Sequence, residues 1–371
     1  MELKGLIPGE QKETKLALPY WEYGTIENNK KKIDPLLHYG CFVLGFNRQD
    51  IIDDVCEQLK KIKPEIAEFV NPIENTLRLN HVSYKLADKI YNLSEGYRSF
   101  YALSGSDANE GAVKLASAYH KEKNNNHKNT IISFKNSYHG STFLTANLGA
   151  DNLMEDPFYT LSKYHGVKRI DRNFEYVSKE WNNVSCIVVE TCSYGNDMTP
   201  NSKEFWNKLT KIQQDHDVIL IIDDIFMGGG KTGNYIGWKH LPIKPDITTM
   251  GKAITAGTFP LSMVLYNEKI HNMLPKNFKW DHGFTYNFSI PGILSALKYL
   301  DILEKENILE QHSNIVTQAE EIIKSSGFEI LNRFGLNFMI KKNKYQMLYL
   351  IPLNADLKYF IELKTHLQEI L

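Results

Sequence analysis

The stretch VILIIDDIFMGGGKTG, Val218–Gly233, decides the fold: an apolar run ends in two adjacent aspartates and a glycine-rich segment. The five consecutive aliphatic residues Val218–Ile222 are typical of a strand that is buried on both faces of a parallel sheet. Open α/β sheets bind ligands outside the carboxyl ends of their strands. The stretch therefore predicts a central strand that delivers Asp223 and Asp224 to a ligand site, where a buried aspartate needs a cationic partner.

Strand-like runs alternate with helical patterns through the middle of the chain. This alternation predicts right-handed βαβ crossovers and the α/β class with a mainly parallel sheet. The expected strands are Thr130–Phe134, Cys186–Glu190, Val218–Asp223 and Leu261–Tyr266, and the expected helices include Lys203–Gln214 and Gly292–Glu306.

The C-terminal part of the chain has a different pattern. The runs FEIL, LNFMIKK and MLYLI are short and strand-like, and a helical segment, Asp356–Leu371, follows them. They predict a small α+β unit. We expect three parts: 1–50 as an N-terminal arm and part of the small domain, 51–305 as the large domain, and 306–371 as a shortened small domain.

Composition excludes several classes of protein. The 43 basic and 44 acidic residues nearly cancel, which argues against binding to nucleic acid or to an anionic membrane. The longest aliphatic run has five residues, far below the roughly 18 of a membrane span. The polar residues after Met1 do not resemble a secretory signal. Four cysteines without CxxC spacing predict a reducing compartment, the cytoplasm, and we expect no metal site.

The run SGSDANEGAVKLASAYH, Ser104–His120, follows the strand-like SFYAL and then takes helical spacing. A strand, a Gly/Ser turn and a helix N-terminus together form an anion site, because free backbone N–H groups and the helix dipole face the anion. Gly105 would let the backbone approach closely, and Ser106 would add a hydroxyl. The alternative is an ordinary helix cap made by Ser106 or Asp107.

Two further runs carry candidate groups. SFKNSYHGSTF, Ser133–Phe143, places Tyr138 and His139 after a strand, where an aromatic ring can stack on a flat ligand or belong to a surface Tyr–His pair. PDITTMGKAITAG places Lys252 between Gly251 and Ala253, where desolvation would make its amine nucleophilic. The alternative for Lys252 is a solvated lysine.

Spacing favours the first interpretation of Lys252. It lies 29 residues after Asp223, with one helix-length and one further strand expected between them. The GKT at Gly230–Thr232 suggests a phosphate loop of a nucleotidase, but that pattern needs glycine where Ile225 stands.

Taken in order, the motifs SGSDANEGAVKLA, NSYHGST, DDIFMGGGKTG, TTMGKAITAG and HGFTYNFSIPG resemble those of class III aminotransferases. The resemblance covers roughly Asp34–Lys305. Within the class it is nearest to diaminopelargonate aminotransferases and glutamate-1-semialdehyde aminomutases. It implies the pyridoxal-phosphate (PLP) transferase fold type I, with a mainly parallel seven-stranded sheet in the large domain, and a homodimer with shared active sites.

The resemblance also implies roles for residues. Lys252 would form the Schiff base with PLP, and Asp223 would pair with the pyridinium nitrogen. Gly105 and Ser106 would bind the phosphate, with Thr285 reaching over from the partner subunit. The remaining expected cofactor contacts are Tyr138, which would stack on the ring, His139, and Glu190 on the side of the phenolic oxygen. The implied reaction moves an amino group from an amine or amino acid to a keto or aldehyde acceptor by a ping-pong mechanism.

Some features depart from the family pattern. Asp223–Asp224 stands where the family has an Asp-Glu pair. The family's Gly-Phe-Gly-Arg is replaced by Gly-Gly-Gly-Lys at Gly228–Lys231. The chain has six arginines, and none matches the C-terminal arginine that holds a substrate carboxylate in many members. We therefore expect an amine, an amino-sugar-like substrate, or a carboxylate far from the reacting carbon. Aromatic residues would line the pocket or else belong to the core: Trp21, Tyr39 and Phe42.

Two alternatives share the fold. An aminomutase of the glutamate-1-semialdehyde type would move the amino group within one substrate, and the motifs do not separate it from an aminotransferase. A non-catalytic PLP-fold protein is the more remote alternative, because Lys252 and Asp223 are both retained.

Overall fold

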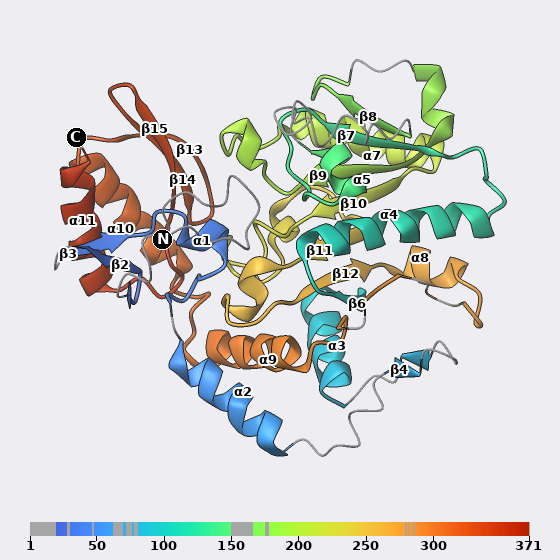
Figure 1. Cartoon of the computed structure of the whole chain (residues 1–371). Helices are drawn as coiled ribbons and strands as arrows, with labels where there is room; N and C mark the ends of the chain where they lie inside the picture. Colours follow the sequence, from blue (N-terminus) through green and yellow to red (C-terminus); the bar gives the residue numbers. More distant parts are fainter. Residues whose placement is uncertain are drawn as a thin grey trace, which may run out of the picture.

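The computed structural model describes residues 20–27, 30–46, 48–61, 70–71, 76–77, 81–149, 166–174, 178–278, 280, 282–284 and 286–370. A seven-stranded sheet lies at the centre of the larger part, in the order β6-β12-β11-β10-β9-β7-β8 (Figure 1). All neighbouring pairs are parallel except the two that β12 forms, so the prediction of a mainly parallel sheet is confirmed. The strands are Arg98–Ala102 (β6), Thr130–Phe134 (β7), Val167–Ile170 (β8), Val184–Glu190 (β9), Ile219–Asp223 (β10), Ile247–Met250 (β11) and Ser262–Tyr266 (β12).

Both faces of this sheet are buried. Because successive side chains of a strand point to opposite faces, Ile219 and Ile221 join the apolar cluster of helix α4 (Gly105–Glu122), while Leu220 and Ile222 join the cluster on the other face. That second cluster includes residues of helices α7 (Lys203–His216) and α9 (Ile290–Lys305). The other elements of this part are α2 (Gln49–Lys61), α3 (His81–Leu93), α5 (Phe143–Leu148), α8 (Glu268–Met273), the pair β4 (Val70–Asn71) and β5 (Thr76–Leu77), and the 3-10 turns Ser178–Asn183, Tyr194–Asn196, Gly237–His240 and Lys252–Thr255.

The expected helix between Asp223 and Lys252 is absent, and that prediction was wrong. The connection from β10 to β11 contains only the 3-10 turn Gly237–His240. Three successive glycines disfavour a helix, and Gly229 and Gly230 adopt φ values of 78° and 102°, which glycine reaches without steric cost. The further strand expected between the two residues, β11, is present.

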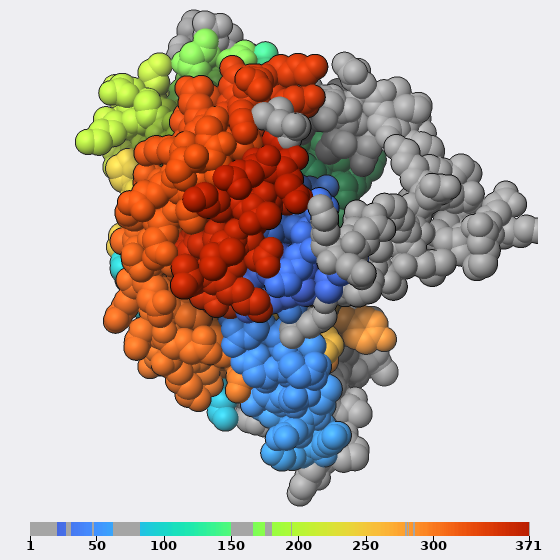
Figure 2. All heavy atoms as spheres, turned by 90° about the vertical axis from the view of Figure 1, so that its left-hand side faces the viewer, coloured from blue at the N-terminus to red at the C-terminus, as the bar shows by residue number. Residues whose placement is uncertain are grey.

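The C-terminal part forms the expected small α+β unit. Strands β13 (Glu329–Phe334), β14 (Asn337–Lys342) and β15 (Tyr345–Leu350) are antiparallel, and helices α10 (His312–Ser325) and α11 (Leu357–Glu369) pack with them. An N-terminal sheet of β1 (Tyr20–Trp21), β2 (Gly24–Glu27) and β3 (Lys30–Ile33) joins this unit. Lys31 and Lys32 of β3 pair with Glu362 and Glu369 of α11 at 3.0 and 3.1 Å, and Figure 2 shows the blue N-terminal segment beside the red C-terminal segment.

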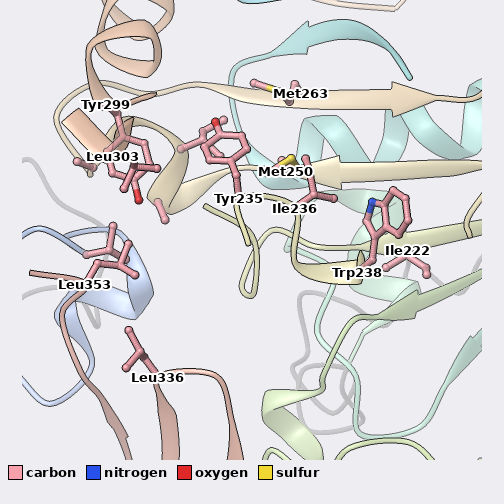
Figure 3. Close-up of a cluster of buried hydrophobic side chains, with 14 of the residues drawn as sticks. Ile222, Tyr235, Ile236, Trp238, Met250, Met263, Tyr299, Leu303, Leu336 and Leu353 are labelled. Atoms are coloured by element: carbon pink, nitrogen blue, oxygen red, sulfur yellow. The ribbon is translucent and has the colours of Figure 1, made fainter. Parts of the chain in front are cut away.

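One apolar core connects the two parts (Figure 3). Tyr299 and Leu303 of α9 lie between the central sheet and the C-terminal residues Leu336 and Leu353. Across the described residues, no helix combines the length and apolar character that a membrane crossing needs. The same residues hold no group of three or more His, Cys, Asp or Glu side chains suited to a metal ion.

Candidate active site

A cavity of about 520 Å³ opens at the carboxyl ends of the central strands. It brings together most of the predicted site residues, although they come from segments more than a hundred residues apart. Its described lining consists of Leu36, Tyr39, Gly105, Ser106, Tyr138, His139, Gly140, Glu190, Asp223, Ile225, Phe226, Lys252 and Leu348.

Asp223 is the last residue of β10, and a fixed set of donors orients its carboxylate. Asn109 Nδ2 donates to Asp223 Oδ2 at 2.7 Å, and His139 Nδ1 lies 2.8 Å from the same oxygen. The backbone N–H of Ile225 donates to Oδ1 at 3.1 Å. Asn109 is held in turn by Thr249, whose hydroxyl donates to Asn109 Oδ1 at 2.8 Å. Asp223 is 5% exposed, so the charge it presents to the cavity is largely shielded from water.

Asp224 does not line the cavity. Thr191 Oγ1 donates to its Oδ1 at 2.6 Å, and the backbone N–H of Gly237 donates to its Oδ2 at 2.7 Å. Burial raises the pKa of Asp224 to about 7. Its carboxylate therefore anchors the loop between β10 and the 3-10 turn Gly237–His240, and Asp223 alone of the pair is available to a ligand.

Lys252 follows β11 and begins a 3-10 turn with φ 50°, in the left-handed region that a residue with a side chain rarely adopts. Its Nζ lies 4.9 Å from the centroid of the Phe226 ring. Burial lowers the pKa of its amine, against the opposing charges of Cys41, Asp223 and Glu190. Lys252 therefore borders the cavity with a desolvated amine, and strained backbone of this kind is frequent at functional sites.

The N-terminus of α4 forms another wall. Ser104 is the N-cap, since its side chain accepts from Asp107 N at 3.2 Å, so neither Ser106 nor Asp107 has that role. Gly105 and Ser106 are the first helical residues and border the cavity, at the end of the helix where backbone N–H groups can bind an anion. A Cβ on Gly105 would lie 2.9 Å from Ile225 Cδ1, so a larger residue would require the Ile225 side chain to shift.

Tyr138 and His139 are not a surface pair. The Tyr138 side chain is 45% exposed and borders the cavity, whereas His139 is 2% exposed and bonded to Asp223. The backbone N–H of Tyr138 donates to Glu190 Oε2 at 3.3 Å. Burial raises the pKa of Glu190, which is 5% exposed at the end of β9.

Other expectations have mixed outcomes. Tyr39 borders the cavity, but Trp21 packs on Tyr23 and Phe42 stacks on Phe46, away from the described lining. Thr285 lies outside the described residues. Sequence reasoning missed Asn109, although a polar side chain on the buried face of a helix was a usable signal. It also missed Leu36, Phe226 and Leu348, which carry no local signal because distant segments bring them to the cavity.

The residues present fit PLP. An anchored aspartate, a desolvated lysine and a helix N-terminus with free N–H groups border one cavity, and these are the groups that hold a pyridinium nitrogen, an aldehyde and a phosphate. His139 Nε2 is buried and makes no hydrogen bond within the described chain. Among the described residues, the His139 imidazole therefore has Asp223 as its only hydrogen-bond partner.

Comparison with known proteins agrees with this geometry. The family model for class III aminotransferases matches residues 23–327. Gamma aminobutyrate transaminase 2 of Solanum lycopersicum is 28% identical over 329 residues, which cover 80% of this chain and 70% of that protein. Acetylornithine/succinyldiaminopimelate aminotransferase of Buchnera aphidicola is 30% identical over 258 residues, 68% of this chain and 60% of that protein. The chain spans less than two thirds of the length of several such relatives, 64% for an uncharacterized aminotransferase of Sinorhizobium fredii.

Solved structures share the fold. Adenosylmethionine-8-amino-7-oxononanoate aminotransferase of Methanocaldococcus jannaschii matches with a TM-score of 0.80 and 24% identity, over 94% of this chain and 91% of that one. The ornithine aminotransferase of Toxoplasma gondii matches with a TM-score of 0.77 and 17% identity, over 96% and 91%. Residues of the ordered motifs line one cavity, and the family model matches residues 23–327, so the chain belongs to the class III aminotransferases.

Proposed function

We propose that this protein is a PLP-dependent aminotransferase that moves an amino group from an amine or amino acid to a keto or aldehyde acceptor by a ping-pong mechanism. One observation carries the proposal: Lys252 and Asp223 border the same cavity, the first desolvated and the second fixed by three donors. A non-catalytic protein would have no need of this arrangement.

The chain's own residues divide the work. When bound, PLP supplies a carbonyl that takes up an amino group and a ring that withdraws electrons. Asp223 would place its negative charge at the ring nitrogen, and Asn109 and His139 keep that carboxylate in place. Lys252, the lysine of the described lining, would hold the carbonyl end of PLP through its amine, and the free amine would move a proton at the substrate carbon. The N-terminus of α4, at Gly105 and Ser106, would hold the phosphate.

The cavity favours an amine substrate over an α-amino acid. The described lining contains no arginine, and its only lysine is Lys252. Leu36, Tyr39 and Leu348 make the wall apolar or aromatic instead. Since a bidentate arginine is the best partner for a buried carboxylate, we propose that one substrate is an amine, is amino-sugar-like, or carries its carboxylate far from the reacting carbon.

We further propose a homodimer with shared active sites. Phe284 and Tyr286 flank Thr285 and are 57% and 72% exposed, which suits a loop that docks on a second copy. The division into an N-terminal arm (1–50), a large domain (51–305) and a small domain (306–371) is proposed with it, as is a cytoplasmic location, supported by the four unpaired cysteines.

The test is a half-reaction screen. Purified protein loaded with PLP is mixed with single amines or amino acids, and the visible absorbance of the enzyme-bound cofactor is followed. An amino donor is expected to bleach it in the absence of any acceptor, and a keto acid or aldehyde is expected to restore it. If no amine or amino acid bleaches the band, the protein is not an aminotransferase.

A further inference from the structure

A second lysine, Lys231, is buried beside the cavity, and the reaction proposed above does not use it. It is 2% exposed and lies in the glycine-rich loop after β10, at the position where the family pattern has arginine. Its Nζ is 5.9 Å from the centroid of the Phe226 ring, whose centroid is 4.9 Å from Lys252 Nζ. Within the described chain, no carboxylate lies at ion-pair distance from Lys231, so a salt bridge does not explain it.

The side chain of Lys231 instead joins two loops through their backbone. Its Nζ donates to Gly228 O at 3.0 Å, in its own loop, and to Gly40 O at 3.3 Å, in the N-terminal segment. Its backbone oxygen accepts from Leu336 N at 2.8 Å and from His312 Nε2 at 3.1 Å, both in the C-terminal part. Lys231 is thus a junction of the large part, the N-terminal segment and the C-terminal unit.

The segment that Lys231 holds is strained. In the turn α1 (Leu37–Gly40), all four residues have positive φ, from 44° at Leu37 to 78° at Gly40. A left-handed conformation is unfavourable for a residue with a side chain, so the turn persists only because its surroundings fix it. Asp34 fixes its start, since Oδ1 accepts from Leu36 N at 2.9 Å and Oδ2 from His38 N at 2.7 Å.

This turn places Tyr39 at the cavity. The Tyr39 side chain borders the cavity yet is 61% exposed, so little packing of its own holds it there. The backbone of the turn must therefore determine its position. Asp34 holds one end of the turn and the side chain of Lys231 holds the other, at Gly40 O.

We propose that Lys231 is a positioning residue for substrate binding: by bonding Gly40 O and Gly228 O it fixes the left-handed turn that places Tyr39 at the substrate end of the cavity. The role in substrate binding rests on the proposed function, whereas the fixing of the turn rests only on the hydrogen bonds of Lys231. Lys231 touches no reacting atom in this scheme and acts through Tyr39.

The chain offers a matched control. Lys128 is 9% exposed and donates to two backbone oxygens, Val184 O at 3.0 Å and His216 O at 2.6 Å, outside the described lining of the cavity. Lys128→Met removes the same kind of bonds as Lys231→Met. Both variants should lose thermal stability, because each leaves buried carbonyls unpaired. Only Lys231→Met should affect the turn.

The first measurement needs no substrate. Backbone amide hydrogen exchange is compared for the peptide spanning 34–44, in which the N–H groups of Gly40, Cys41 and Phe42 are bonded to Leu36 O and Leu37 O. Lys231→Met should speed exchange there about tenfold, the effect of losing one or two hydrogen bonds. Lys128→Met and Lys231→Arg, which keeps the donors, should leave it at the wild-type rate.

The second measurement uses the PLP-loaded enzyme and an amine that reacts with the wild type. Lys231→Met should raise the amine concentration for half-maximal rate about tenfold and leave the maximal rate and the cofactor spectrum nearly unchanged. Tyr39→Ala should do the same. The double variant should be no worse than Tyr39→Ala, because Lys231 acts through that side chain.

Unchanged exchange in Lys231→Met, additive effects in the double variant, or no recovery in Lys231→Arg would overturn the inference. If the methionine variant does not fold, Lys231→Gln, which is too short to span both carbonyls, replaces it with the same criteria. A wild type that reacts with no amine would remove the proposed function, and the exchange result would still decide whether Lys231 tethers the turn.

Discussion

The carboxylate of Asp223 is bonded to a buried histidine: His139 Nδ1 lies 2.8 Å from Asp223 Oδ2. A carboxylate can only accept, so Nδ1 carries the proton of this bond. The two residues are 84 positions apart: His139 lies in the loop after β7, and Asp223 is the last residue of β10. Together with Asn109, His139 determines the orientation of the Asp223 carboxylate and so the position of its negative charge.

Asp223→Asn keeps the shape of the side chain and removes its charge. We expect the variant to retain PLP, because the phosphate site is untouched, and to lose several orders of magnitude in turnover, because a charge in a dry site governs the electron demand of the ring. Asp224→Asn is the control, and its turnover should remain within a few-fold of the wild type. Normal turnover of Asp223→Asn would mean that this carboxylate does not face the ring nitrogen.

Lys252→Ala should be colourless after dialysis, whereas the wild type should stay yellow. Borohydride reduction of the wild type should attach the cofactor covalently to one peptide, the one containing Lys252, which mass spectrometry can identify. Lys231 is the informative competitor, since it is buried near the same Phe226 ring. Labelling at Lys231 would overturn the assignment of Lys252.

Asp224 should make the stability of the fold depend on pH. Its pKa is raised from 3.8 to about 7 by burial, so between these values the folded chain binds more protons than the unfolded chain. The free energy of unfolding therefore falls as pH rises from about 4 to about 7, by at most about 4 kcal/mol for this group.

Asp224→Asn cannot titrate, so its stability should change less over that range. Denaturant titrations of both proteins at pH 4.5 and about pH 7.5 measure the difference. Parallel behaviour of the two proteins would show that Asp224 is ionised throughout.

The preferred amino donor can be identified by comparing how fast different amines and amino acids react. ω-Amines should bleach the enzyme-bound cofactor faster than glutamate or alanine, because the described lining offers no arginine for an α-carboxylate. Tyr39→Ala should weaken binding of the preferred amine about tenfold if the ring packs against its carbon chain. Rapid reaction with α-amino acids alone would contradict the prediction.

Thr285→Ala tests the proposed sharing of sites. If Thr285 contacts the phosphate in the neighbouring subunit, the variant should release PLP more readily during dialysis and keep the wild-type thermal stability of the apoprotein. The active enzyme should also elute as a dimer in size-exclusion chromatography. Activity in a species that elutes as a monomer would rule out an obligatory shared site.

The sequence by itself determined the strands of the central sheet, except β8, and the functional residues at their ends. The expected strand Thr130–Phe134 coincides with β7, and the expected strand Leu261–Tyr266 begins one residue before β12. A short apolar run between turn residues is a local signal of this kind. Local motifs also sufficed to place Gly105 and Lys252 at one site, since strands that end at one edge of a sheet bring their following residues together.

The family resemblance selected Asp223 as the partner of the cofactor, and only the tertiary structure shows that Asp223 borders the cavity and Asp224 does not. Asp223 and Asp224 are adjacent and identical in chemistry, and the sequence cannot say which has Asn109 and which has Thr191 as its partner. The left-handed turn at Tyr39 could not be predicted from the sequence either. The hydrogen bond from Lys231 to Gly40 O, which holds this turn, joins segments 191 positions apart. Such contacts depend on how the two parts of the chain pack, and neighbouring residues carry no information about that packing.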